Sequence, residues 1–375
     1  MADTTRAAIC LAVSSKLSKA DVASIGAVIG LDGFVDEIAQ VVDKRASVGE
    51  FNRLTTIEGF ANRIREARGQ SANIEVVVKL QKLGGNGPIM ANALAAIGLG
   101  VTCIGSLGYP DIHPVFHELA KHARVLSIAE ACHTDALEFD DGKIMLGKLT
   151  PTAEITWDTL VSRIGIDEMV SLVASSRLIG TVNWTMLPYM NDIWRRLAAD
   201  VLPEVPPGER TLFVDLADPE KRTREDLRTG LDVLAVFKPF MHVILGLNLK
   251  EATQVAAALD LPVSADPEKE IEALAVAIRK KMDLGTVVIH PRSGGAAADA
   301  NGSASFAGPF VKHPKISTGA GDHFNAGFVA GRLLGLNLAE SLCMGTATSG
   351  FYVRSAASPS LANLVEFIRD LPAPQ

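Results

Sequence analysis

A glycine-rich stretch in the last fifth of the chain carries the strongest chemical signal. Residues 317–322 read STGAGD, and the segment 323–334 that follows has the composition of a helix. A helix that starts after small residues presents unpaired amides at its amino end, and these bind phosphate together with the positive end of the helix dipole. Asp322 stands at that end, where a carboxylate can accept the proton of an attacking hydroxyl. The pattern indicates phosphoryl transfer; the alternative is a glycine turn with Asp322 as an ordinary helix cap.

A second stretch, residues 82–98, reads KLGGNGPIMANALAAIG. Gly84 and Gly85 permit close approach to a ligand, and the side chain of Asn86 both donates to and accepts from hydroxyls. The spacing GGxG differs from the GxGxxG of dinucleotide-binding folds, and no acidic residue follows at the expected distance, which argues against a dehydrogenase. A purely structural turn from strand to helix is the alternative.

The elements that must position these residues alternate along the chain. Strands are predicted at 27–31, 74–80, 101–104, 176–181, 211–216, 243–247 and 286–290. Helices are predicted at 56–68, 89–97, 249–259, 268–282, 323–334, 338–349 and 361–371. This rhythm implies a parallel sheet with helices on its faces. Residues 140–142, which read DDG between two short apolar segments, predict a hairpin, which we place in a small accessory sheet.

Composition narrows the classes of function. The chain has 375 residues, 48% of them hydrophobic and 21% charged, which fits a globular core rather than disorder. The formal net charge of −7 offers no cationic footprint for nucleic acid or an anionic membrane, so neither is an expected partner. The four scattered cysteines predict thiols in a reducing compartment. A signal peptide and a bilayer-length apolar run are both missing, so the expected location is cytoplasmic.

Two signatures in register resemble those of ribokinase-like (PfkB) carbohydrate kinases. Residues 84–98 resemble the first signature and residues 317–327 the second. Three intervening segments resemble further family elements: 104–108 with Asp111, the NxxE element at 248–251, and 286–296. The resemblance covers roughly 28–371. It implies a ribokinase-like three-layer α/β/α fold with a central, mostly parallel sheet and a small β lid, as a single kinase domain over 1–375 with lid segments near 34–55 and 134–149.

The resemblance also implies an activity: ATP-dependent transfer of the γ-phosphoryl group to a hydroxyl of a sugar or sugar-like molecule. Asp322 would be the base, and the anion hole would consist of the amides of Gly319, Ala320 and Gly321. Nucleotide contacts would come from Asn248, Glu251, Ser293, Gly294, Gly295, Gly319 and Gly321, with Asn248 and Glu251 holding Mg²⁺ mostly through water. Substrate hydroxyls would meet Asp36 first, Asp32 second, and also Gly84, Gly85 and Asn86. A capping box at 248–251 and a hairpin turn at 293–295 are the structural alternatives.

Some residues depart from the family pattern. Ile316 stands where many members have an aspartate that helps to bind a monovalent cation, which argues against potassium activation. Ile89 replaces a common asparagine, so a substrate contact is lost or is supplied by Asn92. Segments 30–38, 84–94 and 136–144 resemble ADP-dependent sugar kinases, but their His-x-Glu element is missing, so ATP is the expected donor. An ADP-dependent sugar kinase, a nucleoside kinase and a non-catalytic sugar- or nucleotide-binding regulator remain alternatives, and a homodimer stays open.

Overall fold

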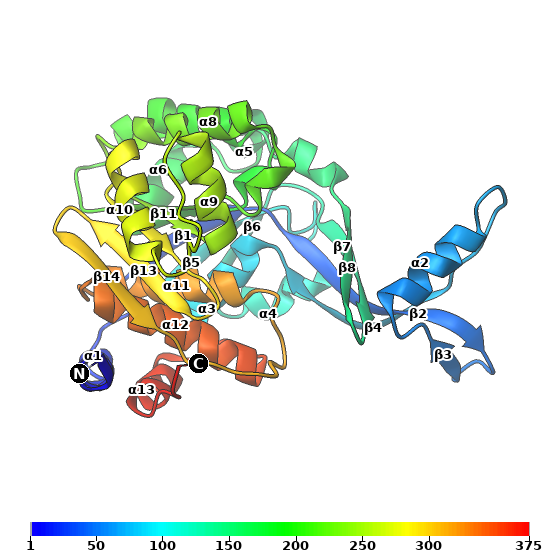
Figure 1. The fold of residues 1–375 in the computed structure, drawn as a ribbon. Coiled ribbons are helices and arrows are strands. Elements are labelled where there is room, and N and C mark those ends of the chain that lie inside the picture. Colours follow the sequence, from blue (N-terminus) through cyan, green and yellow to red (C-terminus); the bar gives the residue numbers. More distant parts are fainter. Residues whose placement is uncertain (1, 375) are drawn as a thin grey trace.

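A nine-stranded sheet forms the centre of the computed structural model, which describes residues 2–374 (Figure 1). Met1 and Gln375, the ends of the predicted domain, lie outside the described residues. The strand order is β14-β13-β12-β11-β10-β9-β1-β5-β6. All pairs from β12 to β6 are parallel, and β13 and β14 add an antiparallel edge. The strands are β1 Gly26–Leu31, β5 Gly100–Gly105, β6 Arg124–Ser127, β9 Leu178–Thr181, β10 Thr211–Asp215, β11 His242–Leu247, β12 Thr286–Ile289, β13 Gly294–Asp299 and β14 Gly302–Ala307.

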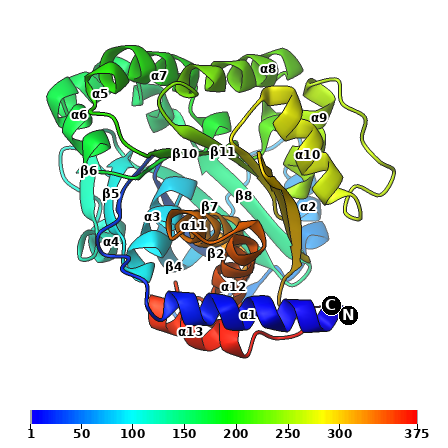
Figure 2. The same ribbon diagram turned by 90° about the vertical axis from the view of Figure 1, so that its left-hand side faces the viewer.

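Helices cover both faces of this sheet, and each face has its own apolar core (Figure 2). One face packs against α5 Trp157–Arg163, α6 Ile166–Ala174, α7 Met190–Arg196, α8 Arg224–Val233, α9 Leu249–Ala258 and α10 Ile271–Met282. The other packs against α1 Ala2–Leu17, α3 Asn86–Ile97, α4 His117–Ala120, α11 Ala320–Leu333, α12 Leu338–Ser355 and α13 Leu361–Arg369. The predicted three-layer α/β/α fold with a mostly parallel sheet is confirmed.

A second sheet of five strands projects from this body (Figure 1). Its strands are β2 Phe34–Arg45, β3 Phe51–Arg53, β4 Val76–Gly84, β7 Cys132–Phe139 and β8 Gly142–Lys148, and α2 Ile57–Glu66 packs against it through a small apolar cluster. The predicted hairpin is present as the antiparallel pair β7 and β8. The assignment of strand 74–80 to the parallel sheet is wrong. That segment is β4, which lies antiparallel to β2 and leaves one apolar face largely exposed, and β5 takes the place beside β1.

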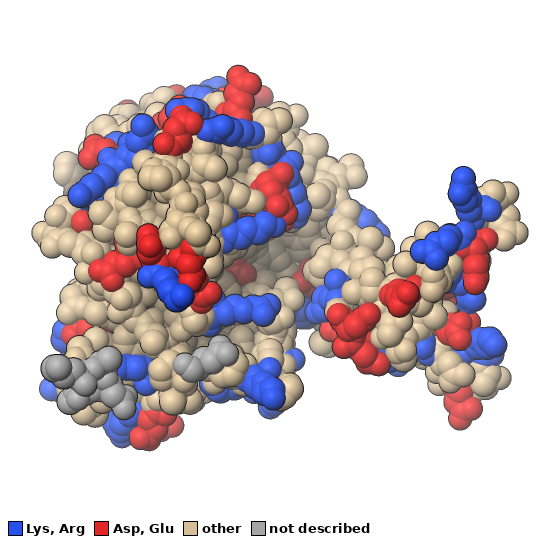
Figure 3. Space-filling view, in the orientation of Figure 1, with Lys and Arg blue, Asp and Glu red and all other residues tan. Residues whose placement is uncertain are grey.

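The chain passes between the outer sheet and the main body four times, and two of these connections are very short. Only Asp32 and Gly33 separate β1 from β2, and only Gly85 separates the end of β4 from the start of α3. The space-filling view shows acidic and basic side chains interspersed over the face in view (Figure 3). None of the described helices is both long and apolar enough to span a bilayer.

Candidate active site

Asp322 lies in the first turn of α11, at the carboxyl-end edge of the central sheet, and only 8% of it is exposed. The side-chain amide of Asn86 donates to its Oδ1 at 2.9 Å, so the structure brings together two predicted site residues that are 236 positions apart in the sequence. Burial raises the pKa of Asp322 to about 7, with smaller upward contributions from Asp32 and Glu251 and an opposing one from the Asn86 hydrogen bond. A carboxyl group with a pKa near neutral is suited to exchange a proton.

The turn before Asp322 reaches the surface. Gly319, Ala320 and Gly321 are partly exposed, and Ser317 is exposed. Gly319 is the N-cap of α11 with a φ of 90°, a left-handed conformation that favours glycine. The amide of Ala320 already donates to the carbonyl of Ser317 at 3.1 Å, so an anion would have to share or replace that bond.

Two side chains hold the carbonyl groups of this turn. The Tyr352 hydroxyl donates to the carbonyl of Thr318 at 2.9 Å, and His323 Nδ1 lies 2.7 Å from the carbonyl of Gly319. The rings of His323 and Tyr352 stack with their centroids 3.6 Å apart. Burial lowers the pKa of His323 to about 4, so the ring is neutral near pH 7 and its single N–H is at Nδ1, facing the Gly319 carbonyl.

A chain of hydrogen bonds continues from the other nitrogen of this ring. His323 Nε2 lies 2.8 Å from Ser358 Oγ, and the side-chain amide of Asn92 donates to the same Oγ at 3.0 Å. Asn92 is therefore engaged behind the turn in this structure, whereas the sequence left it as a substitute substrate contact. Sequence reasoning missed His323, Ser358 and Tyr352, because nothing local to them signals that they meet.

Asp32 is fully buried and occupied by donors. Its carboxylate accepts from the amides of Asn86 at 2.9 Å and Gly87 at 2.7 Å and from the side-chain amide of Asn183 at 2.7 Å. Burial raises its pKa, and these three hydrogen bonds oppose that shift. The carboxylate thus stabilises the amino end of α3, and its predicted substrate contact stays a prediction.

Asp36 lies on the second sheet beside a lysine that the sequence analysis did not single out. Asp36 and Lys82 are register partners on β2 and β4, with Nζ 3.8 Å from Oδ2. Burial raises the pKa of Asp36, while Lys82 and then Thr134 oppose the shift. A Cβ on Gly84 would collide with the Asp36 carboxyl group, so the first glycine of the pair is needed for this packing. Lys82 brings a cation toward a site with several buried carboxylates.

Asn248 and Glu251 form a complete capping box at the start of α9. Glu251 Oε2 accepts from the amide of Asn248 at 2.8 Å, and its Oε1 accepts from the amide of Asp218 at 2.9 Å. The capping box, which is the structural alternative for this segment, is therefore present. It leaves one lone pair on each carboxylate oxygen of Glu251 free to accept from water. A nucleotide or metal role for the pair stays a prediction.

Asp215, at the end of β10, is a further buried carboxylate that sequence reasoning missed. Burial, Glu251 and Asp322 raise its pKa well above the ordinary range, and the side-chain amide of Asn325 donates to it at 2.9 Å. A carboxylate at the carboxyl end of a parallel strand was the available signal, because ligands bind at that edge. Within residues 2–374 no three His, Cys, Asp or Glu side chains are grouped to hold a metal directly.

The segment around Ser293 is a hairpin turn. Its hydroxyl donates to Glu268 at 2.6 Å, while Gly294 and Gly295 begin β13. Gly295 packs closely against Phe324 and Leu342. These contacts account for the glycines structurally, and a nucleotide contact here remains a prediction.

Comparison with known proteins gives three kinds of match. The family model described as prokaryotic ketohexokinase matches residues 1–371. A ketohexokinase from Haloferax volcanii is 28% identical over 340 residues, covering 90% of this chain and 89% of that protein. Among solved structures, a carbohydrate kinase from Agrobacterium tumefaciens has a TM-score of 0.64 at 19% identity, covering 94% of this chain and 98% of that one. A ribokinase from Cryptococcus neoformans in complex with ADP has a TM-score of 0.62 at 15% identity, covering 92% and 99%.

Proposed function

Because the chain belongs to the prokaryotic ketohexokinase family, we propose that it transfers the γ-phosphoryl group of ATP to a hydroxyl of a ketohexose. The predicted resemblance to ribokinase-like carbohydrate kinases is confirmed by this family, by the ketohexokinase relative and by the fold shared with a ribokinase. The chain is thus a carbohydrate kinase. The choice of a ketohexose is our proposal and is supported by the family and the relative, and the choice of ATP is supported by the missing His-x-Glu element. The observation that carries the transfer chemistry is Asp322 beside Asn86 at the amino end of α11.

In the proposed reaction, Asp322 accepts the proton of the acceptor hydroxyl as its oxygen attacks the γ-phosphorus. The new P–O bond forms while the bond from the γ-phosphorus to the β–γ bridging oxygen breaks, and ADP leaves with the electron pair. Asn86 holds one oxygen of Asp322 and so orients the other toward the acceptor. The amino end of α11 and Lys82 offset the charge on the transferring group, which phosphoryl transfer requires.

The family implies Mg²⁺, and the residues present fit it. Asp215, Glu251 and Asp322 each have a raised pKa, and their mutual repulsion contributes to the shifts of Asp215 and Asp322. A divalent cation would relieve that repulsion, and Mg²⁺ characteristically retains water and phosphate ligands rather than an all-protein cage. Asn248, Glu251 and Asp215 would hold it through water, and it would neutralise charge on the nucleotide phosphates.

The second sheet supports two finer proposals. It carries Asp36 and Lys82 on adjacent strands, so movement of this sheet as a lid would bring both to the acceptor and exclude water. Val76, Val78 and Leu80 alternate along β4 and are 42%, 44% and 56% exposed. An apolar strand face of this kind favours a homodimer that covers it.

A coupled assay of ADP formation tests the function. We expect turnover with ATP, Mg²⁺ and fructose, and much less with aldohexoses or nucleosides. ADP in place of ATP as donor distinguishes the ADP-dependent alternative. Saturable sugar binding without turnover for every donor and acceptor would instead identify a binding regulator and refute the proposal.

The pH dependence should follow Asp322. We expect kcat to rise with pH through an apparent pKa near 7, because the base must be deprotonated and burial raises its pKa from 3.8 to about 7. The folded state holds this proton more tightly than the unfolded state, so protonation of Asp322 stabilises the fold. This stabilisation is complete below the pKa of the unfolded state, 3.8, and is lost as pH rises through about 7. Activity and thermal stability should therefore change in opposite directions across neutrality. A flat pH–rate profile there would contradict the assignment.

The contacts behind the turn give another prediction. Tyr352→Phe and Ser358→Ala each remove one hydrogen bond that holds the turn, directly or through His323, so we expect kcat to fall about tenfold through misplacement of the amides and Asp322. The free energy of unfolding should fall by only about 1 kcal/mol. Steady-state kinetics and urea unfolding measure both quantities. Ser162→Ala, whose hydroxyl donates to the carbonyl of Thr159 within α5 on the other face of the sheet, is the matched control. Unchanged kcat in both variants would show that the turn needs no such support.

A further inference from the structure

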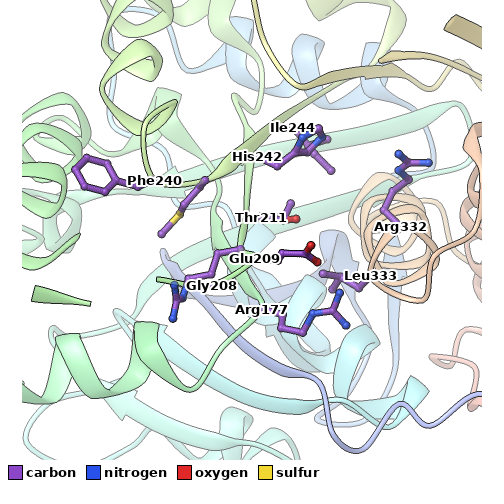
Figure 4. Close-up of a pocket in the computed structure, with 11 residues that line it drawn as sticks. Arg177, Gly208, Glu209, Thr211, Phe240, His242, Ile244, Arg332 and Leu333 are labelled. Carbon is purple, nitrogen blue, oxygen red and sulfur yellow. The ribbon is translucent and has the colours of Figure 1, made fainter. Parts of the chain in front are cut away.

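A hollow with a volume of about 410 Å³ lies at the opposite end of the central sheet from Asp322 (Figure 4). Thr211 and His242, the first residues of β10 and β11, line it, together with Leu333, the last residue of α11. The candidate active site is at the carboxyl ends of these strands and the amino end of α11. The hollow is therefore a separate place, and nothing in the proposed reaction uses it.

Three arginines, Arg177, Arg210 and Arg332, line this hollow. The guanidinium of Arg177 is exposed and makes no hydrogen bond or ion pair within residues 2–374, so all of its donors are free. Glu209 is the one acidic residue among the lining residues, so the lining is net positive in a chain whose net charge is −7.

The other two arginines are held in place by the protein. Arg332 pairs with Asp299 at 3.1 Å and donates to the carbonyl of Leu336 at 2.9 Å. Arg210 donates to three backbone carbonyls, those of Val173, Pro206 and Ala174. Fixed in this way, neither side chain loses freedom when a ligand arrives, and Arg210 contributes a positive charge, whereas the charge of Arg332 is offset by Asp299. Arg177 is left as the group that can pair with an anion directly.

The remaining lining adds polar and apolar groups on either side. Figure 4 shows the Thr211 hydroxyl and the Glu209 carboxylate between His242 on one side and Arg177 on the other. Phe240 is 38% exposed and forms part of the wall with Met241. The planar fork of donors on the Arg177 guanidinium matches a phosphate group. The Glu209 carboxylate and the Thr211 hydroxyl suit the hydroxyl groups of a polyol, and the edge of the Phe240 ring suits the apolar face of a sugar.

We propose that this hollow, the arginine pocket, binds a small sugar phosphate. The phosphate pairs with Arg177 in the field of Arg210, and the sugar hydroxyls bond to Glu209 and Thr211. The volume lies in the range of small-molecule sites. The proposal goes beyond the transfer reaction, because the pocket contributes none of the reacting groups.

Helix α11 connects the pocket to the active site. Arg332 is in its last turn and Asp322 in its first, ten residues apart by number, which is about 15 Å along a helix. A ligand in the pocket would lie against the last turn of this helix, because Arg332 and Leu333 line the pocket, and couplings between linked sites are typically about 5- to 150-fold in affinity. We therefore expect an occupied arginine pocket to change the KM for the ketohexose several-fold.

Calorimetry with fructose 6-phosphate, inorganic phosphate and fructose tests the proposal, with a saturating non-hydrolysable ATP analogue present throughout. Arg177→Glu should weaken binding of both phosphate-containing probes at least tenfold and leave kcat without them unchanged. Glu209→Gln should weaken fructose 6-phosphate but not inorganic phosphate. Arg195→Ala, an exposed arginine on α7 outside the pocket, is the control.

Three outcomes would overturn the proposal. One is wild-type protein that binds neither phosphate-containing probe at millimolar concentration. Another is an unchanged affinity in Arg177→Glu, which would place the phosphate in the active site alone. The last is a loss of fructose affinity in Arg177→Glu as large as the loss for fructose 6-phosphate, because fructose, the proposed substrate, should bind at the active site and not at Arg177. Thermal melting of each variant checks that it is folded, and a wild-type enzyme without kinase activity would refute the proposed function but leave these binding results meaningful.

Discussion

Asp322→Asn should lower kcat by about three orders of magnitude while the affinity for ATP stays within a few-fold, since a positioned general base contributes about 10²- to 10⁴-fold. Asparagine has the shape of aspartate and can still accept from Asn86 through its carbonyl oxygen, so the turn should keep its structure. It cannot take up the proton of the acceptor hydroxyl. The loss should appear in kcat rather than in KM, because the interaction is made in the transition state.

Single-turnover kinetics and nucleotide titration separate these quantities. Asp283→Asn is a matched control: this aspartate ends α10 on the surface in a left-handed conformation that asparagine also adopts. Because Asp322 has its raised pKa only in the folded protein, Asp322→Asn should also remove the pH dependence of the residual activity near neutrality and lessen the fall of stability with pH, to which Asp32 and Asp215 still contribute. Turnover within a few-fold of wild type would mean that another group is the base.

Asp32→Ala should lower the free energy of unfolding by about 3–5 kcal/mol, because it leaves three buried donors unpaired. Two of these donors are the first amides of α3, and one of them belongs to Asn86, so the Asn86 side chain should lose its alignment with Asp322. We therefore expect kcat to fall together with stability.

Urea unfolding and kinetics on the same samples measure both effects. Asn183→Ala, which removes one of the three donors, should cost about 1–2 kcal/mol and is the graded comparison. A variant Asp32→Ala that keeps its stability within about 1 kcal/mol of wild type but raises KM for the sugar would show that Asp32 contacts the substrate and is not chiefly a helix cap.

The predicted site residues that the structure brings together are those whose signals in the sequence are local. A glycine run before an apolar helix defines the Asp322 turn, and a glycine pair between a strand and a helix defines the Asn86 turn, so both could be read without knowing the fold. The strand periodicity likewise predicted the parallel sheet. The NxxE element has two readings in sequence, and the structure contains the capping box without excluding the other role.

The residues that the sequence did not identify depend on contacts between distant segments. Tyr352 and Ser358 support the Asp322 turn only because α12 and the loop after it pack beside α11, and Lys82 reaches the site only because β4 pairs with β2. The assignment of β4 to the parallel sheet was wrong for the same reason. An apolar run predicts that a segment is a strand, but it does not show which strand lies beside it. Asp215 is the exception, since its position at a strand end could have been recognised.

Two of the connections between the sheets have a mechanical consequence. They pass through the candidate site, at Asp32-Gly33 and at Gly84-Gly85, and the connection from β6 to β7 ends beside them, since the amide of Cys132 donates to the carbonyl of Gly33. A swing of the outer sheet would therefore pivot beside the bound sugar rather than far from it. Asp36 and Lys82 lie close to this pivot, whereas β3 lies far from it. A large movement of β3 should then correspond to a small movement of Asp36 and Lys82. Contacts that a neighbouring subunit made with β3 would therefore adjust the positions of these two side chains near the reacting atoms.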